Sequence, residues 1–568
     1  MGTAMTDLHL NRFSRLAALL GLALAGASAH AQEAPSPSVT GSATQADSGG
    51  APPPGAEAPA PAAAPHSRGE IHPYLEVAQT LSADLNGGDT LTYTSVAVGV
   101  NGHVESHRVA AQFGVRYQQN VEWSGDLPNN SMLSGVAQAH LQVAPNLLSF
   151  DVGAMATHTA GEGRAQGVTA QDASVNVYSV YAGPTLSTSA GPVAINAAYR
   201  FGYVKVDDDR HLPANLDQVF DDSTAHSLTA SIGMGTNGGL PFGWTVGGGY
   251  SREDSGGFFG NRFEMAYIRG DVVFPVSPTF ALTAGIGYED IESSQYDYVR
   301  DVNGAIVIGV NGLPVPNPNA PRLSVYKMDD VMYDAGIIWR PSPRTELQAR
   351  AGHRYGGTTF TGSLAHQLNE HEAINAVVFD TVETFGRQLS TNISALPSNA
   401  NINIDPLTGN LSGCVFGANG GGTCLANTLQ RISPSTFRAR GGSIIYAGSR
   451  GLWNYGMGAS YTHHRYFLPT SPVNVAFASE DEIYGVNASL GRQLTRESSV
   501  SVSAYASWYD SDLAALQDVT TVGASLSYDH RFLLDRLQLL AALGLYNSNN
   551  GIDDTAVLSA LVGLRYTF

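Results

Sequence analysis

The sequence predicts an all-β protein: a single large transmembrane β-barrel whose antiparallel strands run up and down. Runs of about ten residues alternate between apolar and small or polar side chains, which is typical of barrel strands. Short and long connections alternate between these runs, and the chain ends on an alternating segment closed by Phe568. Residues 71–568 accommodate about 22 strands, with an uncertainty of about two in either direction.

Residues 1–31 have the features of a secretory signal peptide. Arg12 and Arg15 precede an apolar run, and Ala29-His30-Ala31 matches an A-x-A cleavage pattern. The apolar run is too short to cross a bilayer as a permanent helix, so an uncleaved anchor is the less favoured alternative. We expect an exported protein whose mature chain begins at Gln32.

Residues 32–70 form a predicted linker between the signal peptide and the barrel. They are rich in Pro, Ala, Gly and Ser and lack the large apolar side chains that would offset the entropy of ordering. We expect a disordered periplasmic tail, with contact to peptidoglycan or to an inner-membrane partner as the alternative. The barrel then occupies residues 71–568.

The segment from Arg108 to Gln118 shows the alternation clearly. Apolar side chains occupy every second position (Val109, Ala111, Phe113, Val115, Tyr117), and polar ones lie among the positions between them (Arg108, Gln112, Arg116, Gln118). One face suits lipid and the other suits water. Residues 193–204 and 499–509 repeat the pattern, and residues 71–568 contain no run of 18 apolar residues that would form a transmembrane helix.

The connections favour a membrane barrel over a soluble sandwich, which would also show alternation. Tight turns are predicted at 144–146, 190–192, 237–239, 275–278, 341–343, 449–451 and 495–498, and long polar stretches at 207–222, 292–330 and 388–433. Short periplasmic turns and long outer loops are the asymmetry of outer-membrane barrels.

Aromatic residues are expected to form a girdle at each membrane interface. The residues expected at the outer interface are Tyr117, Trp123, Tyr203, Tyr250, Tyr288, Tyr466, Phe467, Trp508 and Tyr509. Those expected near the periplasmic turns are Phe242, Phe274, Trp339 and Phe532.

The last strand alternates to the end of the chain. Tyr566 and Phe568 share its apolar face, whereas Arg565 and Thr567 share the other. This ending resembles the recognition strand that the barrel-assembly machinery reads, so we expect Tyr566 and Phe568 to act as an assembly signal.

Three short segments carry a family resemblance: residues 72–79, residues 117–123 and the ending at 564–568. Together they resemble a proteobacterial group of outer-membrane β-barrel porins. The resemblance implies a location in the outer membrane, with lipid and lipopolysaccharide as its surroundings. Some members of that group are associated with exopolysaccharide operons, which makes a polysaccharide one expected cargo and small solutes another.

Charge and motifs argue against several other functions. The net charge of −19 argues against nucleic-acid binding, which needs a basic surface. We find no catalytic constellation, cofactor motif or metal-ligand spacing, so an outer-membrane enzyme is the least favoured hypothesis. Iron-complex transporters with barrels of this size carry a globular plug at the N-terminus, where this chain has only the predicted linker. Any closure of the lumen is therefore expected from the loops at 292–330 and 388–433.

Two sets of residues are candidates for a functional role. Cys414 and Cys424 lie in a compartment that oxidises thiols and are predicted to form a disulfide rather than a metal site. Four arginines are predicted to line the lumen: Arg116, Arg200, Arg350 and Arg354. They would bind an anionic solute, although pairing with carboxylates on neighbouring strands is the favoured alternative.

The first functional hypothesis is a porin-like channel or an export conduit for a polymer such as exopolysaccharide. The alternative is a barrel occluded by its own loops, with a structural role or a role in surface interaction.

Overall fold

The computed structural model describes residues 68–568 except 88–89, 126–130, 161–173, 209–220, 237, 258, 310–313, 397–399, 402–404, 409–413, 418–421, 425–428, 430–431, 434, 469–478, 513–517 and 550–553. The predicted signal peptide and residues 32–67 of the predicted linker lie outside the described residues. The first strand begins at Arg68, so the last three residues of the range expected for the linker belong to the barrel wall.

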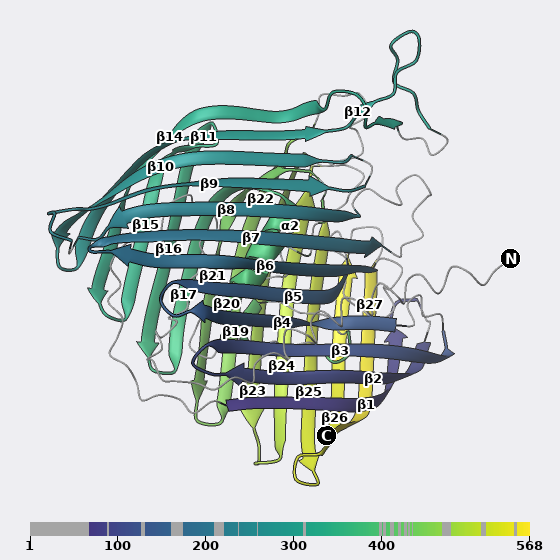
Figure 1. The fold of residues 1–568 in the computed structure, drawn as a ribbon. Coiled ribbons are helices and arrows are strands. Elements are labelled where there is room, and N and C mark those ends of the chain that lie inside the picture. The colour runs from purple at the N-terminus through teal and green to yellow at the C-terminus, as the bar shows by residue number, and fades with distance from the viewer. Residues whose placement is uncertain are drawn as a thin grey trace. The chain divides into compact units, whose positions relative to one another are not determined.

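The described chain forms a closed barrel of 22 antiparallel strands. Each wall strand pairs with the wall strands before and after it in sequence, and β1 also pairs with β27, which closes the barrel. In Figure 1 the strands of the near wall cross those of the far wall at a large angle, as expected for strands that tilt against the barrel axis. The predicted fold class and strand number are confirmed.

The first half of the wall consists of β1 (Arg68–Asp84), β2 (Thr90–Glu105), β3 (Val109–Ser124), β4 (Ser131–Ala144), β5 (Leu148–Ala160), β6 (Ser174–Ala190), β7 (Val193–Asp208), β8 (Asp222–Met234), β9 (Gly243–Ser255), β10 (Arg262–Ser277) and β11 (Phe280–Gln295). The second half consists of β14 (Leu323–Ser342), β15 (Thr345–Arg354), β16 (Gly357–Asn369), β17 (Glu372–Glu383), β21 (Phe437–Arg450), β22 (Trp453–Tyr466), β23 (Glu480–Gln493), β24 (Ser498–Ser511), β25 (Val519–Phe532), β26 (Leu537–Asn549) and β27 (Asp554–Thr567).

Several shorter elements lie outside the wall. They are the strands β12 (Asp297–Tyr298) and β13 (Pro316–Asn317), the helix α2 (Phe385–Ser394), and the strands β18 (Ala400–Asn401), β19 (Cys414–Gly417) and β20 (Gly422–Cys424). No helix among the described residues is long and apolar enough to span a membrane.

The outer face of the wall is apolar. In β1, Leu75 and Val77 are about half exposed, whereas the neighbouring Glu76 and Ala78 are buried. Exposed Val, Leu, Ile and aromatic side chains continue this surface on strands around the barrel. So large an apolar surface is stable in lipid and not in water, and a closed barrel satisfies its backbone hydrogen bonds there. The protein is therefore a barrel of the outer membrane.

The expectation for the aromatic girdles is correct for most residues and wrong for three, one of which is Phe467, because it packs against the buried cluster around Phe263 and Val382. Trp123 and Trp508 are exposed on the outer face near one end, and Trp339 and Phe532 are exposed near the other. Tyr466 and Tyr509, in contrast, are buried at 5% and 2% exposure. Tyr509 directly follows the outward Trp508, and because alternation decides the face, it points into the barrel.

The long connections lie together at one end of the barrel, as predicted, although this end also carries the two-residue turn at Tyr355 and Gly356. The connection predicted at 292–330 is shorter than expected, because β11 continues to Gln295, β14 begins at Leu323, and the β12–β13 hairpin lies between them. The stretch at 388–433 is not structureless, because α2 covers its beginning. Figure 1 shows α2 between the two walls of the barrel, behind β6 to β8.

A buried ion-pair cluster joins the two ends of the wall. Glu76 of β1 accepts hydrogen bonds from Arg565 of β27 at 2.6 and 2.8 Å and from Arg116 of β3 at 2.6 Å. The Glu76 side chain is only 2% exposed. One carboxylate therefore compensates two guanidinium groups at the point where the barrel closes.

We predict that Glu76→Ala destabilises the folded barrel by about 3 kcal/mol, because removing one partner leaves two enclosed arginines without their shared counter-charge. The measurement is the urea concentration at which the refolded protein loses the mobility shift between unheated and heated samples on a gel. Glu70→Ala, which changes an exposed carboxylate on the same strand, is the control. Equal midpoints for both variants would show that the cluster does not hold the seam.

Candidate functional site: the lumen and its inserted segment

At one place on the outer rim the strands of the barrel wall are shorter than their neighbours. β15 ends at Arg354 and β16 begins at Gly357, so only Tyr355 and Gly356 connect them. Both residues have positive φ angles, of 55° and 68°, as a tight two-residue hairpin requires. The wall therefore ends early between its neighbours and leaves space above this turn.

The hairpin of β17 and β21 folds over this low turn. Its pairing with β16 stops at Val378, but β17 and β21 stay paired up to Glu383 and Phe437. Val382 is fully buried in a cluster with Phe263 of β10, on a different part of the wall. The outer part of β17 therefore separates from β16 and folds into the lumen, while β21 stays paired with β22 up to Phe437 and Tyr466.

Residues 384–436, which connect β17 to β21, are named here the luminal segment. Its helix α2 contacts β5, β6, β7 and β8. Six wall strands (β9, β10, β11, β14, β15, β16) lie between β8 and β17. The segment therefore crosses the lumen before it docks, and the expectation that a long loop folds inward is met by this loop.

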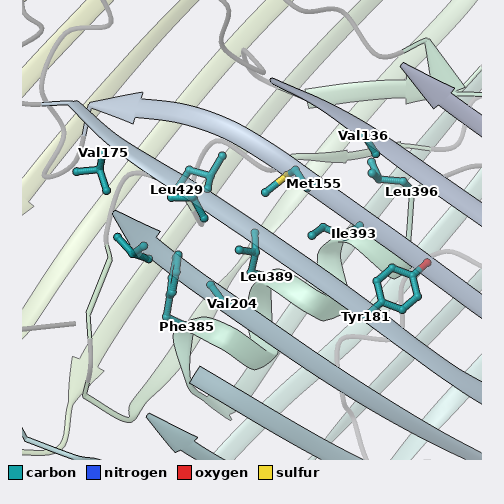
Figure 2. Close-up of a cluster of buried hydrophobic side chains, with 12 residues drawn as sticks. Val136, Met155, Val175, Tyr181, Val204, Phe385, Leu389, Ile393, Leu396 and Leu429 are labelled. Carbon is teal, nitrogen blue, oxygen red and sulfur yellow. The ribbon is translucent and has the colours of Figure 1, made fainter. Parts of the chain in front are cut away.

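An apolar face of α2 packs on the inner wall. Phe385, Leu389 and Ile393 recur every four residues and are at most 1% exposed. Figure 2 shows them directed at wall side chains that include Val204 and Tyr181. Burying a side chain of this size contributes roughly 2 kcal/mol, so this face is a firm attachment.

The wall also binds the N-terminus of α2. Glu253 of β9 accepts hydrogen bonds from the Arg387 backbone N–H at 3.0 Å and from the Thr384 hydroxyl. A carboxylate at this end of a helix compensates its unpaired N–H groups and its dipole. Gly386 fits here because it has no side chain: a Cβ atom would lie 2.7 Å from Oε1 of Glu253.

A second contact joins the luminal segment to the wall at β26, β27 and β1. Leu407 is 4% exposed and packs with Tyr546 and Leu561. Asp405 accepts a hydrogen bond from the Tyr546 hydroxyl at 2.8 Å. Gly544 leaves the space that Leu407 occupies, because a Cβ atom at position 544 would lie 2.6 Å from Cδ1 of that leucine.

All four arginines named from the sequence lie on the inner face, and each has a carboxylate partner. Arg116 pairs with Glu76 at 2.6 Å, Arg200 with Asp151 at 2.6 Å, Arg350 with Asp271 at 2.6 Å and Arg354 with Glu289 at 2.8 Å. These contacts match the alternative in which the arginines pair across strands. Binding of an anionic solute by them stays a prediction.

A second part of the inner wall, over β23, β24 and β25, carries uncharged polar groups. Ser501 pairs with Ser527 at 2.6 Å and Ser503 with Ser525 at 2.7 Å through their hydroxyls. Ser489 of β23 lies opposite Ser503. These residues are named here the hydroxyl rows. The sequence signal for these rows is the serines at alternate positions of β24 (Ser499, Ser501, Ser503 and Ser507), but the sequence did not show which strand completes each pair.

The other predicted residues lie at the edges of the described structure. The backbones of Cys414 and Cys424 lie opposite each other in the β19–β20 hairpin, which is a separation that a disulfide can bridge. The disulfide itself stays a prediction. Tyr566 and Phe568 are exposed on the outer face of β27, and their role in assembly also stays a prediction. The described residues contain no group of three or more His, Cys, Asp or Glu that could hold a metal ion.

No protein-family model matches this sequence, and no curated protein matches it. Solved structures that resemble the fold include the FrpB iron transporter from Neisseria meningitidis, with 10% identity, a TM-score of 0.45 and coverage of 88% of this chain and 82% of that one. The siderophore receptor PiuA from Acinetobacter baumannii has 11% identity, a TM-score of 0.44 and coverage of 87% and 81%. The ferric-catecholate import receptor Fiu from E. coli K12 has 11% identity, a TM-score of 0.46 and coverage of 87% and 81%. At these scores none of the three decides what this barrel carries.

We predict that Gly386→Val releases α2 from the wall without opening the barrel, because the new side chain would overlap Glu253 while every wall strand stays unchanged. Amide hydrogen exchange of residues 385–394 is expected to accelerate at least tenfold, which corresponds to about 1.4 kcal/mol of lost protection. Gly270→Val is the control, because a Cβ at Gly270 meets nothing within 4 Å. Unchanged exchange in α2 would contradict the docking described here.

Proposed function

We propose that this protein is an outer-membrane channel whose polar lumen is narrowed by the luminal segment. The observation that carries the proposal is the contrast between the two faces of the wall. The outer face is apolar, whereas the inner face carries ion pairs and the hydroxyl rows, which suit a water-filled path. The luminal segment then sets how much of that path is open.

The hydroxyl rows favour an uncharged, hydroxyl-rich cargo. Each serine pair retains hydrogen-bonding capacity after its mutual bond, and the rows carry no charge that would hold a counter-ion. Small sugars fit this chemistry, and a neutral polysaccharide is the polymer form of the same cargo. Export of a polymer such as exopolysaccharide additionally requires the luminal segment to leave the lumen. The family of outer-membrane porins that the sequence resembles is consistent with either cargo.

The alternative is a barrel that the luminal segment keeps occluded, with its function on the exposed outer loops. One observation favours it: the segment is attached to the wall at two separate places, through α2 and through Leu407. Conductance separates the alternatives.

We predict that replacing residues 384–436 by Asn-Gly raises the single-channel conductance several-fold in a planar bilayer. Glu383 and Phe437 are register partners, so a two-residue turn closes the β17–β21 hairpin without disturbing the wall. The wild-type protein, refolded in parallel, is the reference. If both proteins are silent while both show the heat-dependent mobility shift of a folded barrel, the channel proposal is wrong.

We also predict that the paired change Ser501→Ala and Ser527→Ala slows the uptake of a neutral disaccharide into liposomes at least twofold and leaves ionic conductance unchanged. Changing both partners leaves neither hydroxyl of this pair without a partner, so the fold is expected to tolerate it. Val502→Ala with Leu526→Ala, a cross-strand pair on the lipid face, is the matched control. Equal uptake by both variants would rule out a role for the hydroxyl rows.

A further inference from the structure

We propose that the contact of Asp405 and Leu407 with the wall is a proton-controlled latch, which closes the lumen at acidic pH and releases as the pH rises. This inference rests on the proposed channel function and names the regulation of that channel. Asp405 and Leu407, with their wall partners, are named here the latch.

The latch places a carboxyl group in an enclosed contact between two parts of the chain. Asp405 is 6% exposed although it lies on the luminal segment and not in the wall. Its Oδ1 accepts a hydrogen bond from the Leu407 backbone N–H at 2.9 Å, and its Oδ2 accepts one from Tyr546 at 2.8 Å. Release of the segment would return this carboxyl group to water, so its environment differs sharply between the two states.

The side chains that face Asp405 carry no positive charge. Tyr546 of β26 and Tyr505 of β24 contribute phenols, and Ser525 of β25 contributes a hydroxyl. Ala78 of β1 and Leu561 of β27 complete the surroundings with apolar side chains.

The latch also lacks an ion pair. No Arg, Lys or His in the described part of the chain pairs with Asp405, whereas the enclosed carboxylates Glu76, Asp271 and Glu289 each pair with arginine. Asp405 is therefore easier to accommodate with a proton than without one.

Burial raises the pKa of Asp405 above its ordinary value. The docked segment then binds the proton more tightly than the released one. Docking is at full strength below the ordinary pKa of a free aspartate, weakens as the pH rises toward the raised pKa, and stays weakened above it. The proton thus favours the closed position.

The two attachments of the luminal segment differ in strength, which decides where it opens. Three apolar residues of α2 and the carboxylate of Glu253 hold the first attachment. One leucine and the carboxyl group of Asp405 hold the second. Loss of the proton from Asp405 therefore weakens the second attachment, which has fewer apolar contacts than the first.

The test compares the pH dependence of single-channel closure in the full-length wild-type protein and in Asp405→Asn, between about pH 4 and pH 8. We expect the closed fraction of the wild type to fall at least fivefold across this range. Asp405→Asn is expected to stay closed throughout, because an amide cannot ionise. Its Oδ1 is able to accept from the Leu407 backbone N–H while its Nδ2 donates to the Tyr546 hydroxyl oxygen. Glu105→Gln is the control, since it removes an exposed carboxyl group from the periplasmic end of β2 and leaves the latch intact.

A second variant and a second readout keep the outcome decisive. Gly544→Val fills the space that Leu407 occupies and is expected to hold the latch open at every pH. The exchange of the Leu407 amide, corrected for its intrinsic pH dependence, should report release in a detergent-solubilised sample whether or not current flows. Its protection is expected to fall with rising pH in the wild type only.

The latch proposal is wrong if the wild type and Asp405→Asn show the same pH dependence, both in channel closure and in amide exchange. That result would leave the channel proposal unaffected. Silence of every protein, including the one that lacks the luminal segment, would overturn the channel proposal. In that case the amide exchange of Leu407 still decides whether a proton controls the contact.

Discussion

The structure depends first on the pairing of β1 with β27. Lipid offers no hydrogen-bond partners, so each backbone group in a membrane sheet needs a partner on a neighbouring strand, and only a closed sheet supplies one everywhere. Tyr74 lies opposite Thr567 at one end of this seam and Asp84 opposite Val557 at the other. The cluster around Glu76 reinforces the closure from inside. Alternation along each strand then assigns every side chain to lipid or to lumen, so the chemistry of the inner face follows from closure.

The lumen is shaped by one irregularity in this regular wall. The tight turn at Tyr355 and Gly356 lowers the rim, and Arg438 of the folded-over hairpin donates a hydrogen bond to the carbonyl of Tyr355 at 3.2 Å. A wall of even height would keep β17 paired with β16 to the rim and would direct the connection from β17 to β21 outward. The low turn and the luminal segment are thus parts of a single arrangement, in which a missing piece of wall lets a loop enter the lumen.

Period-two alternation was enough to predict the barrel, its 22 strands and the inward position of Arg116 and Arg200, because these depend on local sequence. The partners of those arginines were not predictable, since Asp151 comes from a strand that the sequence does not place beside Arg200. The helix α2 was also missed. Its apolar positions, Phe385, Leu389 and Ile393, are separated by polar residues, and their counterparts lie on distant strands. The prediction for Tyr509 was wrong for a different reason. Its place near the membrane interface suggested that its side chain faces lipid, but the alternation along β24 directs it inward.

The position of the luminal segment is nevertheless indicated by the sequence of the wall strands. A strand that separates lipid from water should be apolar on one face only, yet β6 and β7 carry apolar residues on both. Val177 and Val204 point inward and are at most 1% exposed, because α2 covers them. Ala78 and Leu561 occupy inward positions beside Leu407 in the same way. Inward apolar residues would be costly against water, so where a barrel strand breaks the alternation, the chain itself must supply the cover. These two breaks in the alternation coincide with the two attachments of the luminal segment.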